Sequence, residues 1–224
     1  MMKATTVLAA ALLAATAFPA IAADGDERAV QVKLLSTAVL PDGRITDLRE
    51  DSVGLPADTQ TRANDNVVPT IAAEYFLGDS FSVETICCLT QHDVDGTTGL
   101  PGAELVSDAK LIPATVTLKY HVPVAGIKPY LGAGPAYFIW VDVEPGAATI
   151  PLGVTRTTLS DELGLALQAG VDIPLGDSGM GLSLDAKRYF IDTTASWYAG
   201  DTLAIRTEHE LDPWVLSAGV AWRF

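Results

Sequence analysis

The stretch WVLSAGVAWRF, residues 214–224, alternates between two kinds of side chain along its whole length. The first set is apolar and mostly large: Trp214, Leu216, Ala218, Val220, Trp222 and Phe224. The second set is smaller or polar: Val215, Ser217, Gly219, Ala221 and Arg223. Because successive side chains of a strand point to opposite faces, the pattern predicts a strand with one face suited to lipid. The edge strand of a soluble protein rarely exposes such an apolar row.

Seven further segments show the same period of two, at residues 30–34, 70–75, 81–90, 115–122, 130–140, 162–171 and 182–187. Together with residues 214–224, they predict eight strands. After the first residues, no segment reaches the roughly 18 consecutive apolar residues of a transmembrane helix. We therefore expect an all-β chain that forms an eight-stranded antiparallel transmembrane β-barrel with up-and-down order.

The connections between these segments are of two kinds. Short turns rich in Gly, Pro, Asp and Ser are expected at residues 77–80, 123–126 and 174–179. Long polar loops are expected at residues 41–66, 93–110, 144–157 and 193–210. Long and short connections alternate strictly, as in a barrel with both termini in the periplasm, short periplasmic turns and long external loops.

The N-terminal residues predict export. Lys3 provides a positive start, residues 5–18 are apolar, and Ala20 and Ala22 are small residues before a cleavage site. We interpret residues 1–22 as a signal peptide and residues 23–224 as the barrel domain, in the outer membrane of a Gram-negative bacterium. The apolar run is too short for an anchored membrane helix. The alternative to a signal peptide is a buried N-terminal helix.

Charged side chains occupy the face opposite the lipid row. They are Lys33, Glu74, Glu84, Lys119, Asp172, Asp185, Lys187 and Arg223. At membrane depth such groups require a polar interior and partners of opposite charge. An eight-stranded barrel is just wide enough to be filled by side chains. Two interpretations follow: a plug of salt bridges, or a lining that orients a solute.

The composition argues against several other functions. The net charge of −14 argues against nucleic acid as a partner, because like charges repel. The acidic loops are either solvated or able to recruit divalent cations. The adjacent Cys87 and Cys88 would point to opposite faces and suit neither a disulfide nor a metal motif. His92, His121 and His209 lack metal-ligand spacing, and no nucleophile or cofactor motif is present. We expect no enzyme activity, no metal and no cofactor.

Several ordered segments resemble the OmpW family of small outer-membrane barrels. They are IPATVTLKY (112–120), KPYLGAG (128–134), QAGVD (168–172), IDTTA (191–195), LDPW (211–214) and the final Arg223-Phe224. Each is short, but together they span most of the chain after residue 22. The resemblance implies a narrow, largely apolar pocket or channel open to the outside, which passively admits small hydrophobic or amphipathic molecules and releases them sideways into the membrane.

Aromatic residues are the candidate lining of this pocket. Phe138 and Trp140 lie on the inward face near the outer end of their strand, and Trp197 and Tyr198 in the last loop could cover it. The alternative is that all four are interfacial aromatics, which are common at barrel rims. We expect Trp222 and Phe224 to signal to the barrel assembly machinery, with outer-membrane lipids and lipopolysaccharide around the barrel.

Lys187 and Arg188 depart from the aromatic or apolar pattern of the family. Simple alternation turns Lys187 inward, where a cation would suit an anionic or amphipathic solute better than an apolar one. Arg188 then faces lipid near the outer rim and reaches its phosphates, unless a bulge shifts the register. A structural or surface-interaction barrel, with its lumen plugged by salt bridges, is therefore the alternative to a transporter; a lipid enzyme would need a nucleophile near His121 or His209.

Overall fold

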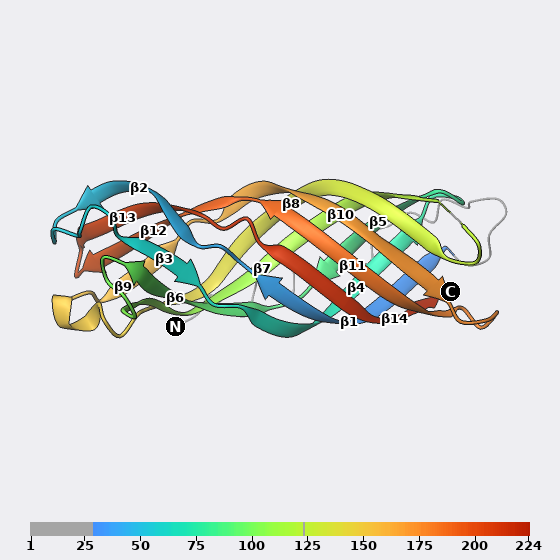
Figure 1. The fold of residues 1–224 in the computed structure, drawn as a ribbon, viewed down its shortest axis with the longest axis horizontal. Coiled ribbons are helices and arrows are strands. Elements are labelled where there is room, and N and C mark those ends of the chain that lie inside the picture. Colours follow the sequence, from blue (N-terminus) through green and yellow to red (C-terminus); the bar gives the residue numbers. More distant parts are fainter. Residues whose placement is uncertain (1–28, 123) are drawn as a thin grey trace.

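The computed structural model describes residues 29–122 and 124–224, so the expected signal peptide lies outside the described residues. Eight antiparallel strands form a closed ring (Figure 1). In ring order they are β1 (Val30–Leu40), β4 (Asn66–Phe76), β5 (Phe81–Cys87), β7 (Glu104–His121), β8 (Lys128–Pro145), β10 (Glu162–Pro174), β11 (Met180–Phe190) and β14 (Trp214–Arg223). Pairing of β7 with β8 completes the ring, and the predicted eight-stranded barrel is confirmed.

Six further strands continue the wall beyond one end of the ring (Figure 1). They are β2 (Arg44–Asp51), β3 (Gln60–Ala63), β6 (Thr90–Thr98), β9 (Arg156–Leu159), β12 (Asp192–Ala199) and β13 (Thr202–Glu210). Four of them form a separate sheet in the order β2-β13-β12-β9, whereas β3 and β6 pair with each other and β6 with β7. We call these six strands, with residues 104–111 of β7 and 140–145 of β8, the strand extension.

The prediction of long polar loops was wrong for most of their length, because the strand extension occupies these segments. Beyond the lipid both faces of a strand can be polar, so the contrast in hydrophobicity disappears while backbone pairing continues. In β2, for example, Arg44, Asp47 and Glu50 interrupt any apolar row. The single strand predicted at residues 81–90 was also wrong, since the wall is interrupted at Cys88 and Leu89, between β5 and β6.

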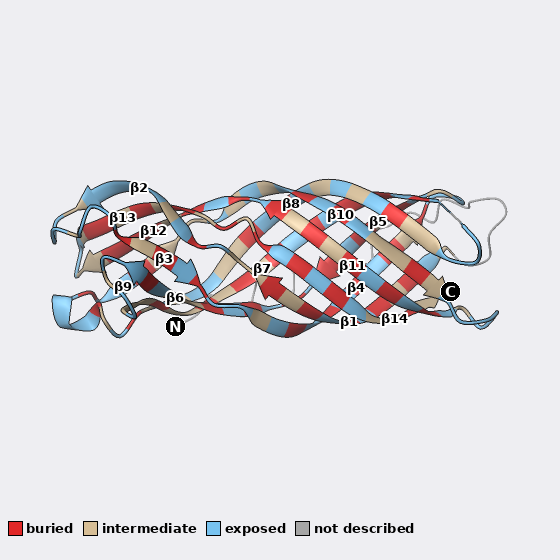
Figure 2. Cartoon of the chain, in the orientation of Figure 1, coloured by how far each residue is buried: buried red, intermediate tan, exposed pale blue. Residues whose placement is uncertain are grey.

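The two faces of the ring differ as the alternation predicts. Trp214 and Leu216 of β14 are exposed, whereas Val215 between them is buried. Figure 2 shows buried and exposed residues alternating along the strands of the ring. The outward face carries large apolar side chains and the inward face carries the buried polar ones, which is the arrangement of a barrel in lipid. Within the described residues no helix is long and apolar enough to cross a membrane.

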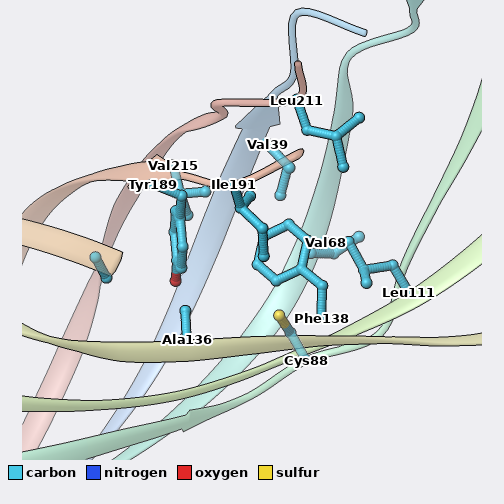
Figure 3. Close-up of a cluster of buried hydrophobic side chains, with 11 residues drawn as sticks. Val39, Val68, Cys88, Leu111, Ala136, Phe138, Tyr189, Ile191, Leu211 and Val215 are labelled. Atoms are coloured by element: carbon cyan, nitrogen blue, oxygen red, sulfur yellow. The ribbon is translucent and has the colours of Figure 1, made fainter. Parts of the chain in front are cut away.

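Two clusters of buried apolar residues lie toward and within the strand extension. Phe138 and Tyr189 lie in the first cluster with their ring centroids 5.4 Å apart, and Cys88 and Leu111 contribute to it (Figure 3). The second cluster surrounds Trp197 in the strand extension. The barrel therefore has an apolar interior toward the extension, and its buried charged residues lie in the other half.

Candidate functional site

A buried group of charged side chains crosses the lumen of the ring. Its seven members are Lys33, Glu74, Glu84, Lys119, Asp172, Asp185 and Lys187, and we call them the ionic cluster. They come from β1, β4, β5, β7, β10 and β11, so six of the eight ring strands contribute. The period of two directs each side chain inward, and closure of the ring then brings residues distant in sequence together.

Glu84 lies at the centre of the ionic cluster. Its carboxylate is 3.0 Å from the ammonium of Lys33, 2.9 Å from that of Lys119 and 3.1 Å from that of Lys187. Gln168 also donates a hydrogen bond of 2.8 Å to the same carboxylate. A buried carboxylate is stable only with such partners, and here three cations from three strands supply them.

The remaining acids complete the cluster. Glu74 pairs with Lys33 at 2.9 Å and with Lys119 at 2.8 Å. Asp172 pairs with Lys33 at 3.3 Å, and Asp185 pairs with Lys187 at 2.7 Å. Three lysines thus face four carboxylates, and each ion has at least one partner of opposite charge.

Neutral and aromatic groups extend this network to the other walls. Tyr130 of β8 donates to Asp185 at 2.8 Å, and the ammonium of Lys119 lies 3.7 Å from the centre of its ring. His121 Nε2 lies 3.0 Å from Glu74 and 2.7 Å from the hydroxyl of Ser82. With Tyr130, groups from seven ring strands span the lumen at this level.

Glu74, His121 and Asp172 offer ligand atoms within 4.8 Å of one another. The ammonium of Lys33, however, contacts both carboxylates at 2.9 and 3.3 Å. The lysine therefore supplies the positive charge that a metal ion would bring, and the three residues belong to the ionic cluster.

A cavity lies on the other side of the ionic cluster, toward the strand extension. Its volume, measured as the space that the centre of a water-sized sphere can occupy, is about 50 Å³. Lys187 borders it from the ionic cluster, Phe138, Trp140 and Tyr189 line its wall, and Ala195 lines its end within the extension. Most of the lining is apolar, so the lumen changes sharply from charged to apolar at Lys187.

The five candidate pocket residues occupy two places. Phe138, Trp140 and Lys187 line the cavity. Trp197 is buried in the strand extension, and its indole N–H donates to the carbonyl of Leu105 at 2.9 Å. Tyr198 lies under the guanidinium of Arg156, 3.9 Å from the ring centre. A register shift between Trp197 and Tyr198 separates their environments.

Arg223 lines a second pocket together with Asp172 of the ionic cluster, whereas Arg188 lies elsewhere on the barrel. The guanidinium of Arg223 stacks on the ring of Phe76 at 3.8 Å. Arg188 is half-buried, donates to the backbone oxygen of Asp212 and lies 5.6 Å from the ring of Trp214. Arg188 therefore reaches protein acceptors near the rim, a partner that simple alternation did not indicate.

Sequence reasoning missed several lining residues. Tyr189 lies two residues after Lys187, so the same alternation places its side chain on the inward face. His209 gave no signal, because it lies in the loop predicted at residues 193–210, and His92 lies between the strand predicted at 81–90 and the loop predicted at 93–110. Both are buried and line the cavity, each bonded to a threonine two residues earlier, at 2.9 Å to Thr90 and 2.6 Å to Thr207.

The wall beside the cavity has a gap in its strand pairing. Pairing of β4 with β5 ends at Ile71 and Cys87. Pairing of β5 with β7 ends at Ile86 and resumes, as β6 with β7, at Thr90. Pro113 of β7 lies opposite the gap and has no N–H to donate. At this gap Cys88 faces the cavity and Cys87 is exposed on the outside.

A closed ring with an apolar outer face and an ion-paired interior defines an outer-membrane β-barrel. Residues 26–224 match the model of the OmpW family. The chain belongs to the OmpW family, and the resemblance seen in the sequence is confirmed.

The individual relatives that match the chain are also outer-membrane proteins. The chain is 34% identical over 166 residues to the uncharacterized outer-membrane protein y4mB of Sinorhizobium fredii, covering 72% of this chain and 67% of that protein. It is 27% identical to outer membrane protein W of Vibrio cholerae, over 76% of this chain and 79% of the other. Among solved structures, OprG of Pseudomonas aeruginosa aligns with a TM-score of 0.78 at 24% identity, covering 88% of this chain and 96% of OprG. AlkL in lipid bilayers aligns with a TM-score of 0.70 at 22% identity, covering 92% and 95%.

Family membership places the chain in the lipid of a Gram-negative outer membrane. Barrels of this family are not enzymes.

Proposed function

We propose that this barrel takes up small apolar molecules passively from outside the cell, holds them in the cavity, and releases them sideways into the membrane. The observation that carries the proposal is the position of an apolar cavity directly against the ionic cluster. An apolar molecule gains free energy by leaving water for such a lining. It gains none by displacing the paired lysines and carboxylates beyond Lys187.

Release occurs through the wall of the barrel, because the ionic cluster closes the other way out of the cavity. The gap beside Cys88 lies at the level of the cavity, and Leu89 next to it is exposed on the outward face. Pro113 leaves one side of this gap without a donor for strand pairing. A molecule in the cavity therefore needs to part side chains at this level, whereas between β8 and β10 it would have to break a continuous ladder of hydrogen bonds.

We also propose how the barrel is oriented in the membrane and what surrounds it. Both termini lie in the periplasm, and the strand extension projects outward beyond lipopolysaccharide. The charged outer surface of the extension, with the pair of Arg49 and Glu208 at 2.8 Å, suits water and lipid headgroups. Trp222 and Phe224 present β14 to the barrel assembly machinery during insertion.

A structural or surface-interaction barrel is the second candidate. It is favoured by the closure of the lumen at two levels, by the ionic cluster and by the apolar cluster around Trp197. In this account the strand extension binds molecules on its outer surface and nothing enters the cavity. Uptake separates the two candidates, because only the first requires a solute to reach Cys88.

The adjacent cysteines provide a matched test. Cys88→Phe fills the cavity beside the gap, whereas Cys87→Phe adds the same ring on the lipid face. We expect Cys88→Phe to reduce the uptake of radiolabelled naphthalene into cells with an intact lipopolysaccharide layer at least about fivefold, and Cys87→Phe to leave uptake unchanged. Filling a packed interior destabilises by about 1–3 kcal/mol, so the folded fraction of each variant is measured by its heat-dependent gel mobility.

Equal uptake by the two folded variants would contradict the proposed route. If cells with the native protein take up no more naphthalene than cells without it, the structural barrel is favoured.

A further inference from the structure

The polar side chains that line the cavity are almost all satisfied within the protein. Thr37 and Ser217 bond to each other at 2.8 Å. The hydroxyl of Tyr189 lies 3.2 Å from that of Thr115. Lys187 contacts Glu84 and Asp185. Each of these groups thus has at least one hydrogen-bonding or ionic partner within the protein.

His92 and His209 are satisfied in the same way. Besides their threonine partners, His92 Nδ1 lies 2.7 Å from the carbonyl of Asn64 and His209 Nδ1 lies 3.2 Å from that of Gly43. In each neutral ring one nitrogen donates to the carbonyl and the other accepts from the threonine. Neither ring has a nitrogen left for a solute.

The indole nitrogen of Trp140 is different. It is fully buried and has no hydrogen-bond partner among the described residues, although Trp140 lines the cavity. The indole nitrogen of Trp197, in contrast, has the carbonyl of Leu105. Thr70 is the other lining residue with a hydroxyl lacking a conventional partner, and it faces the thiol of Cys88, a weak hydrogen-bonding group.

We infer that the cavity selects neutral, mostly apolar molecules that carry one hydrogen-bond acceptor, and that Trp140 Nε1 is the donor that recognises it. This inference rests on the proposed uptake function and names its class of solute. An indole N–H can only donate, so the matching group is a carbonyl, ester or ether oxygen. A buried donor without an acceptor is unfavourable, so a solute that supplies the acceptor gains over an equally large hydrocarbon.

The surroundings of Trp140 explain why the solute is neutral. Lys187 is the charged residue of the lining, and two carboxylates already hold it. A carboxylate solute would approach those acids, and a cationic solute would approach the ammonium. Transfer of an unpaired ion into the apolar part of the cavity is strongly unfavourable in either case. Phe138 and Tyr189 line the cavity with aromatic rings, which favours an aromatic body in the rest of the molecule.

The test compares acetophenone with ethylbenzene, two molecules of similar size of which only the ketone accepts a hydrogen bond. Both are titrated into the full barrel in lipid nanodiscs, with the four indole N–H signals followed by NMR. We expect acetophenone to shift the Trp140 indole proton downfield and ethylbenzene to leave it nearly unchanged. Trp140→Phe should weaken acetophenone binding about threefold to tenfold and ethylbenzene binding less than twofold.

Trp197→Phe is the matched control, since it removes an indole N–H that is already bonded, and it should leave the preference for the ketone intact. Equal binding of both molecules to the native barrel, without an indole shift, would overturn the inference. The cavity would then remain a binding site for apolar molecules that does not use the Trp140 donor. Binding of neither would overturn the proposed function as well. The indole shift is read on the native chain, so the test holds even if Trp140→Phe folds poorly.

Discussion

The carboxylate of Glu84 and the ammonium of Lys187 lie 3.1 Å apart where the ionic cluster meets the apolar cavity. Glu84 also holds Lys33 and Lys119, so one carboxylate on β5 joins three strands across the lumen. The contact closes the charged half of the lumen and leaves the apolar half as a chamber with its floor at Lys187.

Glu84→Gln should destabilise the barrel by about 1–3 kcal/mol, because the three buried lysines lose the carboxylate they share and keep only Glu74, Asp172 and Asp185 as counterions. Equilibrium unfolding by urea in lipid vesicles measures this change. The control is Glu208→Gln, which removes an exposed partner of Arg49 and should not change the unfolding free energy measurably. A loss below about 1 kcal/mol for Glu84→Gln would mean that water or the remaining acids compensate the lysines.

Gly170→Ala should destabilise the barrel through Tyr130, its partner on β8. A Cβ atom at residue 170 would lie 2.5 Å from Cζ of Tyr130, so the ring and its hydrogen bond to Asp185 would have to move. We expect a loss of about 1–3 kcal/mol in unfolding free energy.

A double-mutant cycle with Tyr130→Leu isolates this cause. The smaller side chain leaves room for a methyl group, so Gly170→Ala should cost less in that background. The same cost in both backgrounds would mean that the backbone of β11, and not Tyr130, opposes the methyl group.

Acidic pH should loosen the strand extension. Burial lowers the pKa of His209 and of His92 below the ordinary value of about 6.5. The unfolded chain therefore binds protons more tightly, and the extension is most stable above pH 6.5 or so and loses stability as the pH falls through the lowered pKa. Hydrogen exchange of β2 and β13 should accelerate between pH 7.5 and pH 5, after correction for the intrinsic effect of pH.

His209→Gln keeps a polar side chain of similar reach but cannot become charged. It should flatten part of this pH dependence, and the double variant with His92→Gln should flatten more. A pH dependence as steep in the double variant as in the native barrel would assign the effect to the acidic groups of the extension.

Much of the fold could be predicted because lipid imposes a strict contrast on each ring strand. In residues 214–224 every second side chain meets lipid, so the pattern is visible without any neighbour. In the strand extension that constraint ends, and strands such as β2 carry charges on a face that water covers. Their pairing depends on β13, a partner that lies more than 150 residues away in the sequence and leaves no local pattern.

The candidate site was predictable to the same degree. The period of two placed Lys33, Glu84 and Lys187 on the inward faces of their strands, and closure of the ring brought these side chains together. Which acid meets which lysine follows from strand register, which the sequence does not state. The cavity itself depends on Phe138 and Tyr189 from β8 and β11 meeting residues of the extension, so its shape could not be read from any one segment.

The most direct test of this account combines two measurements on the native barrel. Ion conductance is recorded in planar bilayers, and naphthalene uptake is measured in cells that carry the same protein. Because the ionic cluster closes the lumen while the cavity stays apolar, we predict uptake above cells without the protein and no steady conductance. A steady conductance that rises with salt concentration would show an open path through the ionic cluster and would contradict the account.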